Sequence, residues 1–179
     1  MPNNCYCVLS IYDEEQIEAV VSAIRGEDTA FDFDRLIPYP SGWRQEDDAR
    51  QKWDDEFYAI PRDNLEAQKQ YIAEHGKQPD DAYNTKHGFE WCCLTWGTKW
   101  NAYDIEVESH TVSELIINFH TAWKPPLPII DLLAAMFPNI ESMTFEYYES
   151  GMSFCGSIRY SKGKRCNEAR SEYYGRLGG

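Results

Sequence analysis

Long apolar segments are missing from this sequence. No apolar run of 18 or more residues occurs among its 179, and a membrane-spanning helix needs such a run. The first residues, MPNNCYC, also lack the basic start and apolar core of a secretory signal. We therefore expect a protein of the cytoplasm. A hydrophobic content of 42% is enough for a folded core in a chain of this length.

Recognisable catalytic and metal-binding motifs are missing too. The six cysteines form no CxxC pair, which excludes zinc-ribbon and thioredoxin-type sites and favours buried thiols. The four histidines show no HExxH or similar ligand spacing, and the string WGTKW lacks the spacing of a phosphate loop. We expect no metal, no cofactor and no enzymatic activity.

Basic residues are scarce over most of the chain. Residues 1–160 hold 28 Asp and Glu against 12 Lys and Arg, a net charge of −16, and residues 161–179 contribute +3. Nucleic-acid binding depends on Lys and Arg, so the acidic body makes direct binding of nucleic acid unfavourable. The acidity either serves solubility or provides a surface for a basic partner, such as a nucleic-acid-binding protein.

Hydrophobic periodicity predicts the order of the secondary structure. Strands alternate with period 2, and helices repeat apolar residues at spacings of 3 and 4. The two prolines of residues 30–40 predict an irregular segment there, and 76–83 reads as a loop. The predicted strands are 5–12, 104–109, 114–121, 143–148 and 153–160, and the predicted helices are 14–25, 45–57, 64–75 and 128–137.

This order predicts an α+β fold, a ferredoxin-like sandwich. Outside a polar helical insertion at about 42–88, the elements run strand, helix, strand, strand, helix, strand, which is the order of that fold. A further strand at 153–160 adds a C-terminal hairpin. We thus expect one domain over residues 1–160 and a basic, flexible tail over residues 161–179.

Five strings carry a resemblance to a known family. They are MPNNCYC, FDFDRLIPYP, WGTKWNA, FHTAWKPPLP and YYESGMSFCG, in this order along the chain. Together they resemble the Api-ninety-two-like, or YubB-type, ferredoxin-like domain family, although that family has Trp and Asn where this chain has Asn4 and Cys7. The resemblance implies the fold and a phage, plasmid or other mobile-element setting in a bacterial host. It implies no activity, because the family's function is unknown.

Two groups of residues are candidates for binding. Acidic side chains on one predicted strand face and in the insertion form a candidate interaction surface. Its members are Asp104, Glu106, Glu108, Glu46, Asp47, Asp48, Asp54, Asp55 and Glu56. Aromatic side chains around a lysine form a candidate ligand groove, consisting of Trp96, Lys99, Trp100 and Trp123, in which the lysine would hold an anion. The same residues can instead be a solvated sheet face and a packed core corner.

The acidic surface leads to our first functional hypothesis. It is a non-enzymatic accessory protein of a mobile element that binds a basic host or phage protein, as an anti-defence inhibitor or nucleic-acid mimic does. The alternative is a small-molecule or peptide binder that uses the Trp and Lys groove. An enzyme or an RNA-binding module ranks last. Tyr6, Tyr12 and Tyr148 can share the open sheet face, but RNP motifs are absent and Glu106, Glu108 and Glu146 would repel phosphate there.

Overall fold

The computed structural model describes residues 3–179, so the first two residues of the MPNNCYC string lie outside it. The chain divides into two compact units. One, the sheet unit, combines the residues up to Pro38 with Trp91–Gly179, and the other, the helical unit, is Tyr39–Glu90. The insertion that the sequence predicts at about 42–88 lies within the residues of the helical unit.

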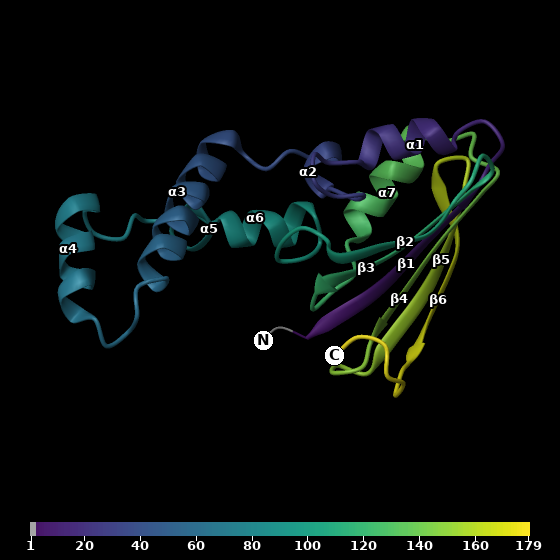
Figure 1. Cartoon of the computed structure of the whole chain (residues 1–179). Helices are drawn as coiled ribbons and strands as arrows, with labels where there is room; N and C mark the ends of the chain where they lie inside the picture. The colour runs from purple at the N-terminus through teal and green to yellow at the C-terminus, as the bar shows by residue number, and fades with distance from the viewer. Residues whose placement is uncertain (1–2) are drawn as a thin grey trace. The chain divides into compact units, whose positions relative to one another are not determined.

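The sheet unit is built on one six-stranded antiparallel sheet with the order β2-β3-β1-β4-β5-β6 (Figure 1). The first four positions, β2-β3-β1-β4, are those of a ferredoxin-like sandwich, and β5 and β6 extend the sheet on the β4 side. The strands are β1 (Asn4–Tyr12), β2 (Tyr103–His110), β3 (Glu114–Ala122), β4 (Ser142–Glu149), β5 (Phe154–Ser161) and β6 (Lys164–Glu172).

The alternation of β1 decides which face of the sheet is the core. Cys5, Cys7, Leu9 and Ile11 are each 0% exposed, and the residues between them are less buried. Their partners on β3 and β4 are buried as well, including Phe119 opposite Cys7. The core therefore lies against one face, where Figure 1 shows the helices α1 (Ile17–Ile24) and α7 (Leu127–Met136).

Local chemistry sets the ends of these helices. The Asp13 carboxylate accepts hydrogen bonds from the backbone N–H groups of Glu15 and Gln16, at 2.7 and 2.6 Å, just before α1. This satisfies amides that a helix start leaves without partners. Pro128 lies in the first turn of α7, where proline's fixed φ fits and its missing N–H costs nothing.

The helical unit contains α3 (Ser41–Tyr58), α4 (Leu65–His75) and α5 (Ala82–Thr85). The apolar side of α3 is held by aromatic contacts, with the Trp53 ring stacked on Phe57 at 4.6 Å between ring centres. Trp53 is also the buried residue of α3 and donates from its indole to the Gly76 carbonyl. These contacts give this polar, charged segment a small core of its own.

Two expectations about secondary structure are wrong, and one helix was not predicted. Residues 30–40 are not wholly irregular, because α2 (Phe33–Leu36) forms one turn before Pro38, capped by the Asp32 side chain. Residues 82 and 83 of the predicted loop belong to α5, and the aromatic stretch before WGTKW is the helix α6 (Gly88–Thr95). Short helices escape periodicity analysis because one or two turns give no repeat to recognise.

The expectation of a flexible tail over residues 161–179 is also wrong, because residues 164–172 form the strand β6. The strand pairs with β5 from Phe154↔Glu172 to Ser161↔Lys164, so two strands rather than one extend the sheet. Arg165 fixes β6 to α7 through two 2.7 Å hydrogen bonds to the Asp131 carboxylate, which also accepts from the Tyr160 hydroxyl. The residues of β6 are all exposed, so its polar sequence gave no hydrophobic pattern.

Among residues 3–179, no helix is long and apolar enough to cross a membrane. All six cysteines are free thiols: Cys5, Cys7 and Cys92 are buried as expected, Cys93 and Cys155 are half-buried, and Cys166 is exposed.

Removing the charge of Asp131 should loosen β6. We expect Asp131→Asn to lower the free energy of unfolding by about 1 kcal/mol, because it removes a paired, part-exposed carboxylate. Amide hydrogen exchange should become faster in β6 and stay unchanged in β1. Glu141→Gln removes the same charge from an exposed position and serves as control. Equal exchange in both variants would show that the Arg165 pair does not hold the strand.

Candidate functional site: an aromatic and acidic sheet face

The face of the sheet opposite α1 and α7 carries side chains in rows that cross the strands. Strand pairing places His120 and Tyr148 on either side of Tyr6, and Tyr103 beyond His120. All four side chains are half-buried. Neighbouring strands are about 4.8 Å apart, so this aromatic row spans roughly 14 Å from β2 to β4.

The rings of the aromatic row contact one another in sequence. Tyr103 stacks on His120 with 5.9 Å between ring centres, and His120 lies 5.4 Å from Tyr6. Tyr6 is 6.4 Å from Tyr148, which is 5.2 Å from Tyr173, just beyond β6. Such spacings suit attractive ring contacts. The result is a continuous aromatic surface built from segments far apart in the sequence.

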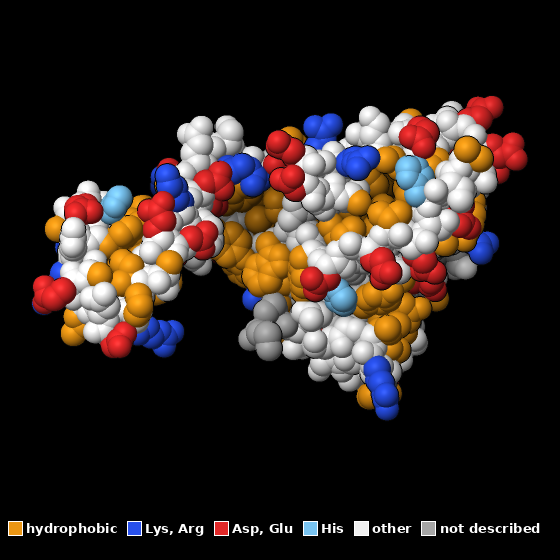
Figure 2. Space-filling view, in the orientation of Figure 1, with side chains coloured by type: hydrophobic (Ala, Val, Ile, Leu, Met, Phe, Trp, Pro, Cys, Tyr) orange, Lys and Arg blue, Asp and Glu red, His pale blue; other side chains and the backbone are white. Residues whose placement is uncertain are grey.

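A second row, with a carboxylate at each end, runs beside the aromatic row. Glu106 pairs with Asn118 on β3, Asn118 with Val8, and Val8 with Glu146 on β4. Residues two apart on a strand are roughly 6.6–7 Å apart, which sets the distance between the rows. In Figure 2, acidic side chains gather along the β2 edge of the sheet, next to a histidine.

Two irregularities in β2 bring its other acids to the same place. The pairing with β3 shifts between Tyr103 and Glu106 and again between Val107 and Ser109, so the strand does not alternate evenly. Glu108 accepts a 3.0 Å hydrogen bond from the Asn118 amide, and an Asp104 carboxylate oxygen lies 3.8 Å from Nδ1 of His120. The three acids predicted to share a strand face, Asp104, Glu106 and Glu108, therefore do line the open face.

Burial and charge act together on the aromatic row. Burial raises the pKa of Tyr6, and the Glu108 and Glu106 carboxylates raise it further. Burial also raises the pKa of Tyr148, again with help from Glu146. For His120, burial lowers the pKa, and the nearby Asp104 carboxylate opposes that shift. The tyrosines and the histidine are thus neutral at pH 7 and carry no positive charge to offset the acids.

Two buried polar atoms in this region have no hydrogen-bond partner within residues 3–179. They are Nδ1 of His120 and Oδ1 of Asn118, which belong to adjacent rows on β3. Buried polar atoms of this kind are uncommon and call for an explanation. Both atoms are covered by neighbouring side chains, so neither is open to a ligand in this structure.

The predicted acids of the insertion behave differently. Asp47 accepts from the Tyr39 hydroxyl and from the backbone amides of Ala82 and Tyr83, so it is a structural residue of the helical unit. The other partnered acids bond inside that unit as well: Glu46 to Lys86, Asp54 to Arg50 and Gln78, Asp55 to Gln51, and Glu56 to Tyr71. Asp48 is exposed.

The predicted Trp and Lys groove is only partly assembled. Trp96 is 4% exposed and donates from its indole to the Ile37 carbonyl, so it belongs to the core. The Lys99 ammonium lies 4.7 Å from the ring centre of Trp123 and 5.9 Å from that of Trp100. The lysine therefore packs across two tryptophan faces, rather than anchoring a ligand between Trp96 and Trp100.

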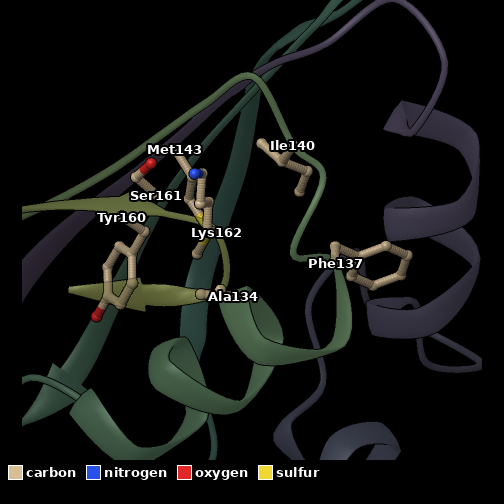
Figure 3. A pocket seen from close by; sticks show the side chains of 8 residues that line it. Ala134, Phe137, Ile140, Met143, Tyr160, Ser161 and Lys162 are labelled. Atoms are coloured by element: carbon tan, nitrogen blue, oxygen red, sulfur yellow. The ribbon is translucent and has the colours of Figure 1, made fainter. Parts of the chain in front are cut away.

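Two further features of the described residues offer little chemistry. Within residues 3–179, no three His, Cys, Asp or Glu side chains lie close enough to hold a metal ion. The cavity in Figure 3, between the end of α7 and the β5–β6 turn, measures about 10 Å³. That is the space of about one water molecule, so Phe137, Ile140 and Met143 there are core packing.

His120 and Tyr103 were not predicted as parts of a site. The tyrosines expected on the open face were Tyr6, Tyr148 and Tyr12. Tyr12 lies six residues beyond Tyr6 on β1, opposite Glu114, so it is not part of the aromatic row. Alternation along β1 and β3 turns Tyr6 and His120 away from the core face. Only the β1–β3 register sets them side by side.

The histidine in the aromatic row should make stability depend on pH. Its pKa is lower in the folded than in the unfolded protein, so the unfolded chain binds the proton first as pH falls below about 6.5. The free energy of unfolding should therefore fall with acidification, with a slope of up to about 1.4 kcal/mol per pH unit from this group. His120→Phe should remove that component between pH 7.5 and the lowered pKa, measured by urea unfolding. His75→Phe, in the helical unit, is the control, and an unchanged slope in His120→Phe would contradict the assignment.

Part of the chain is similar in sequence to known proteins. A family model described as the ferredoxin-like domain in Api92-like protein matches residues 95–175, which contain β2 to β6 and α7. No curated protein matches the chain. A crystal structure of the protein api92 from Yersinia pseudotuberculosis is 13% identical and aligns over 97% of this chain and 98% of its own, with a TM-score of 0.47. Residues 95–175 are therefore similar to the ferredoxin-like domain of Api92-like proteins, a domain of unknown function.

Proposed function

We propose that this protein acts by binding, without catalysis, and that its open sheet face holds a basic segment of a partner protein. One observation carries the proposal: the aromatic row Tyr103–His120–Tyr6–Tyr148 lies directly beside the carboxylates of Glu106, Glu108 and Glu146. An arginine side chain can bind to both the aromatic rings and the carboxylates. Its planar guanidinium stacks on aromatic rings and forms charge-assisted hydrogen bonds with carboxylates.

The geometry favours a cationic over an anionic occupant. A guanidinium lying on Tyr6 would have the Glu146 carboxylate roughly 8 Å away on the neighbouring strand β4, and the carboxylates of Glu106 and Glu108 two strands away on β2. A nucleic-acid base would find the same rings, but its phosphates would face the same carboxylates. Arg159, opposite Thr144 on β5, is a cation on this face, and it lies two rows away from Tyr148.

Such a partner would itself use basic side chains to bind nucleic acid. Occupying them with a protein surface of opposite charge would block that binding, which is how a nucleic-acid mimic or an anti-defence inhibitor of a mobile element works. The overall charge of −13 supports this, because an acidic protein attracts basic partners from a distance. The same charge keeps it away from nucleic acid.

The test uses a defined probe, a fluorescein-labelled peptide with arginine at alternate positions. Binding measured by fluorescence anisotropy should weaken about tenfold between about 50 and about 300 mM sodium chloride, because salt screens the charge pairing. The double variant Glu106→Gln/Glu146→Gln should weaken binding by about tenfold at low salt. Tyr6→Leu should weaken it by about threefold, and Tyr6→Phe should keep most of the affinity because the ring remains.

The matched control is Glu27→Gln/Glu141→Gln, which removes two exposed charges from the same unit outside the two rows. It should change the affinity less than about twofold. Equal losses in the two double variants would mean that only net charge attracts the peptide. Tighter binding of single-stranded DNA than of the peptide would show that the face is a nucleic-acid surface, and either result would overturn the proposal.

A further inference from the structure

The sheet unit contains a cavity of about 560 Å³ where the first turn of α7 meets the ends of β4, β5 and β6. This volume lies within the range of small-molecule sites. The cavity brings together three of the strings singled out in the sequence, WGTKWNA, FHTAWKPPLP and YYESGMSFCG. Its lining includes Gly97, Lys124, Leu127, Tyr147, Phe154 and Arg170.

Two glycines of these strings fit the backbone around the cavity. Gly97 has φ +85°, a left-handed conformation that side chains disfavour, and a Cβ there would lie 2.7 Å from Cδ of Pro128. Gly156 leaves space for the Tyr147 ring, which a Cβ would contact. Close approach at these points sets the positions of Pro128 and Tyr147, and both residues line the cavity.

The walls are mainly apolar and the charged side chains in the lining are both cations. Pro125, Leu127 and Phe154 are among the apolar residues, whereas Lys124 and Arg170 supply the positive charge. The Arg170 guanidinium also forms an ion pair with the Glu168 carboxylate at 2.7 Å, so part of its positive charge is already neutralised by that neighbour. Lys124 is exposed at the cavity rim.

The remaining polar groups are weaker. The Cys155 thiol and the Ser171 hydroxyl contact each other at 3.1 Å. The first amides of α7 are already used, since the Leu127 N–H donates to the Pro125 carbonyl and the Ile129 N–H to the Pro126 carbonyl. The helix therefore contributes the positive end of its dipole, and hydrogen bonding to a ligand falls to the side chains.

We propose that this cavity binds a small organic anion with an apolar body, such as a medium-chain carboxylate. The hydrocarbon lies against Pro125, Leu127 and Phe154, and the carboxylate pairs with Lys124 and Arg170. In a protein with a net charge of −13, two cations at an apolar cavity form a local site of opposite sign. Lys124, Arg170 and the apolar walls lie outside the aromatic and acidic rows of the open sheet face, although Cys155 and Ser171 continue the row of Tyr148 on β5 and β6. The ligand proposed here has the opposite charge.

The experiment compares two probes with the same hydrocarbon, decanoate and decanol, by isothermal titration calorimetry and by 15N chemical shifts of the full chain. Decanoate should bind with a Kd of about 0.1 mM, and decanol about tenfold more weakly because it lacks the charge. The amide signals of Gly97, Cys155 and Ser171 should shift, and those of Tyr6 and Glu106 should not.

Variants identify the cation. Lys124→Gln should weaken decanoate binding by about fivefold, and Lys124→Arg should preserve it. Lys164→Gln removes an equivalent charge at the other end of β6 and should change binding less than about twofold. A folded spectrum is required for each variant, and Arg170→Gln provides a second test if Lys124→Gln fails to fold. No saturation up to about 2 mM decanoate, equal binding of decanol, or equal losses in Lys124→Gln and Lys164→Gln would each overturn the proposal.

Discussion

Strand β1 is hydrogen-bonded along both edges, to β3 on one side and β4 on the other. Its strict alternation therefore sets the two faces of three strands at once. Cys5, Cys7, Leu9 and Ile11 define the core face, and a shift of one residue would turn all four to the other side. The same register sets Tyr6 between His120 and Tyr148, so the aromatic row depends on the alignment that builds the core.

The two faces of the sheet differ in chemistry for this reason. The core face is covered by helices and is filled with aliphatic and aromatic side chains, including the edge-to-face contact of Phe31 with Phe119 at 5.0 Å. The open face keeps polar groups beside its rings, since no hydrophobic core requires their removal. Neutral rings and carboxylates share the open surface, which is the basis of the cation site proposed there, whereas the cavity near α7 joins apolar walls with Lys124 and Arg170.

The C-terminal strand shows how a polar segment becomes ordered without a hydrophobic pattern. Every residue of β6 is exposed, yet the strand is fully paired with β5 and bonded to Asp131 of α7 through Arg165. Backbone hydrogen bonds and one charge-assisted pair supply what apolar burial supplies elsewhere. Its position also completes the cavity, to which it contributes Arg170 and Ser171.

The sequence by itself determined the strand–helix order, the alternating faces of β1 and the ferredoxin-like class, because long periodic segments record which side is buried. It also placed Asp104, Glu106 and Glu108 together, since they lie on one strand. The tertiary structure alone decided that Trp96 is a core residue, that Asp47 is consumed by internal hydrogen bonds, and that Tyr103 and His120 join Tyr6. Those facts depend on strand register and on contacts between residues far apart in the sequence, such as Tyr6 opposite His120 and the bond from Tyr103 to Asn4, and no local pattern encodes such pairings.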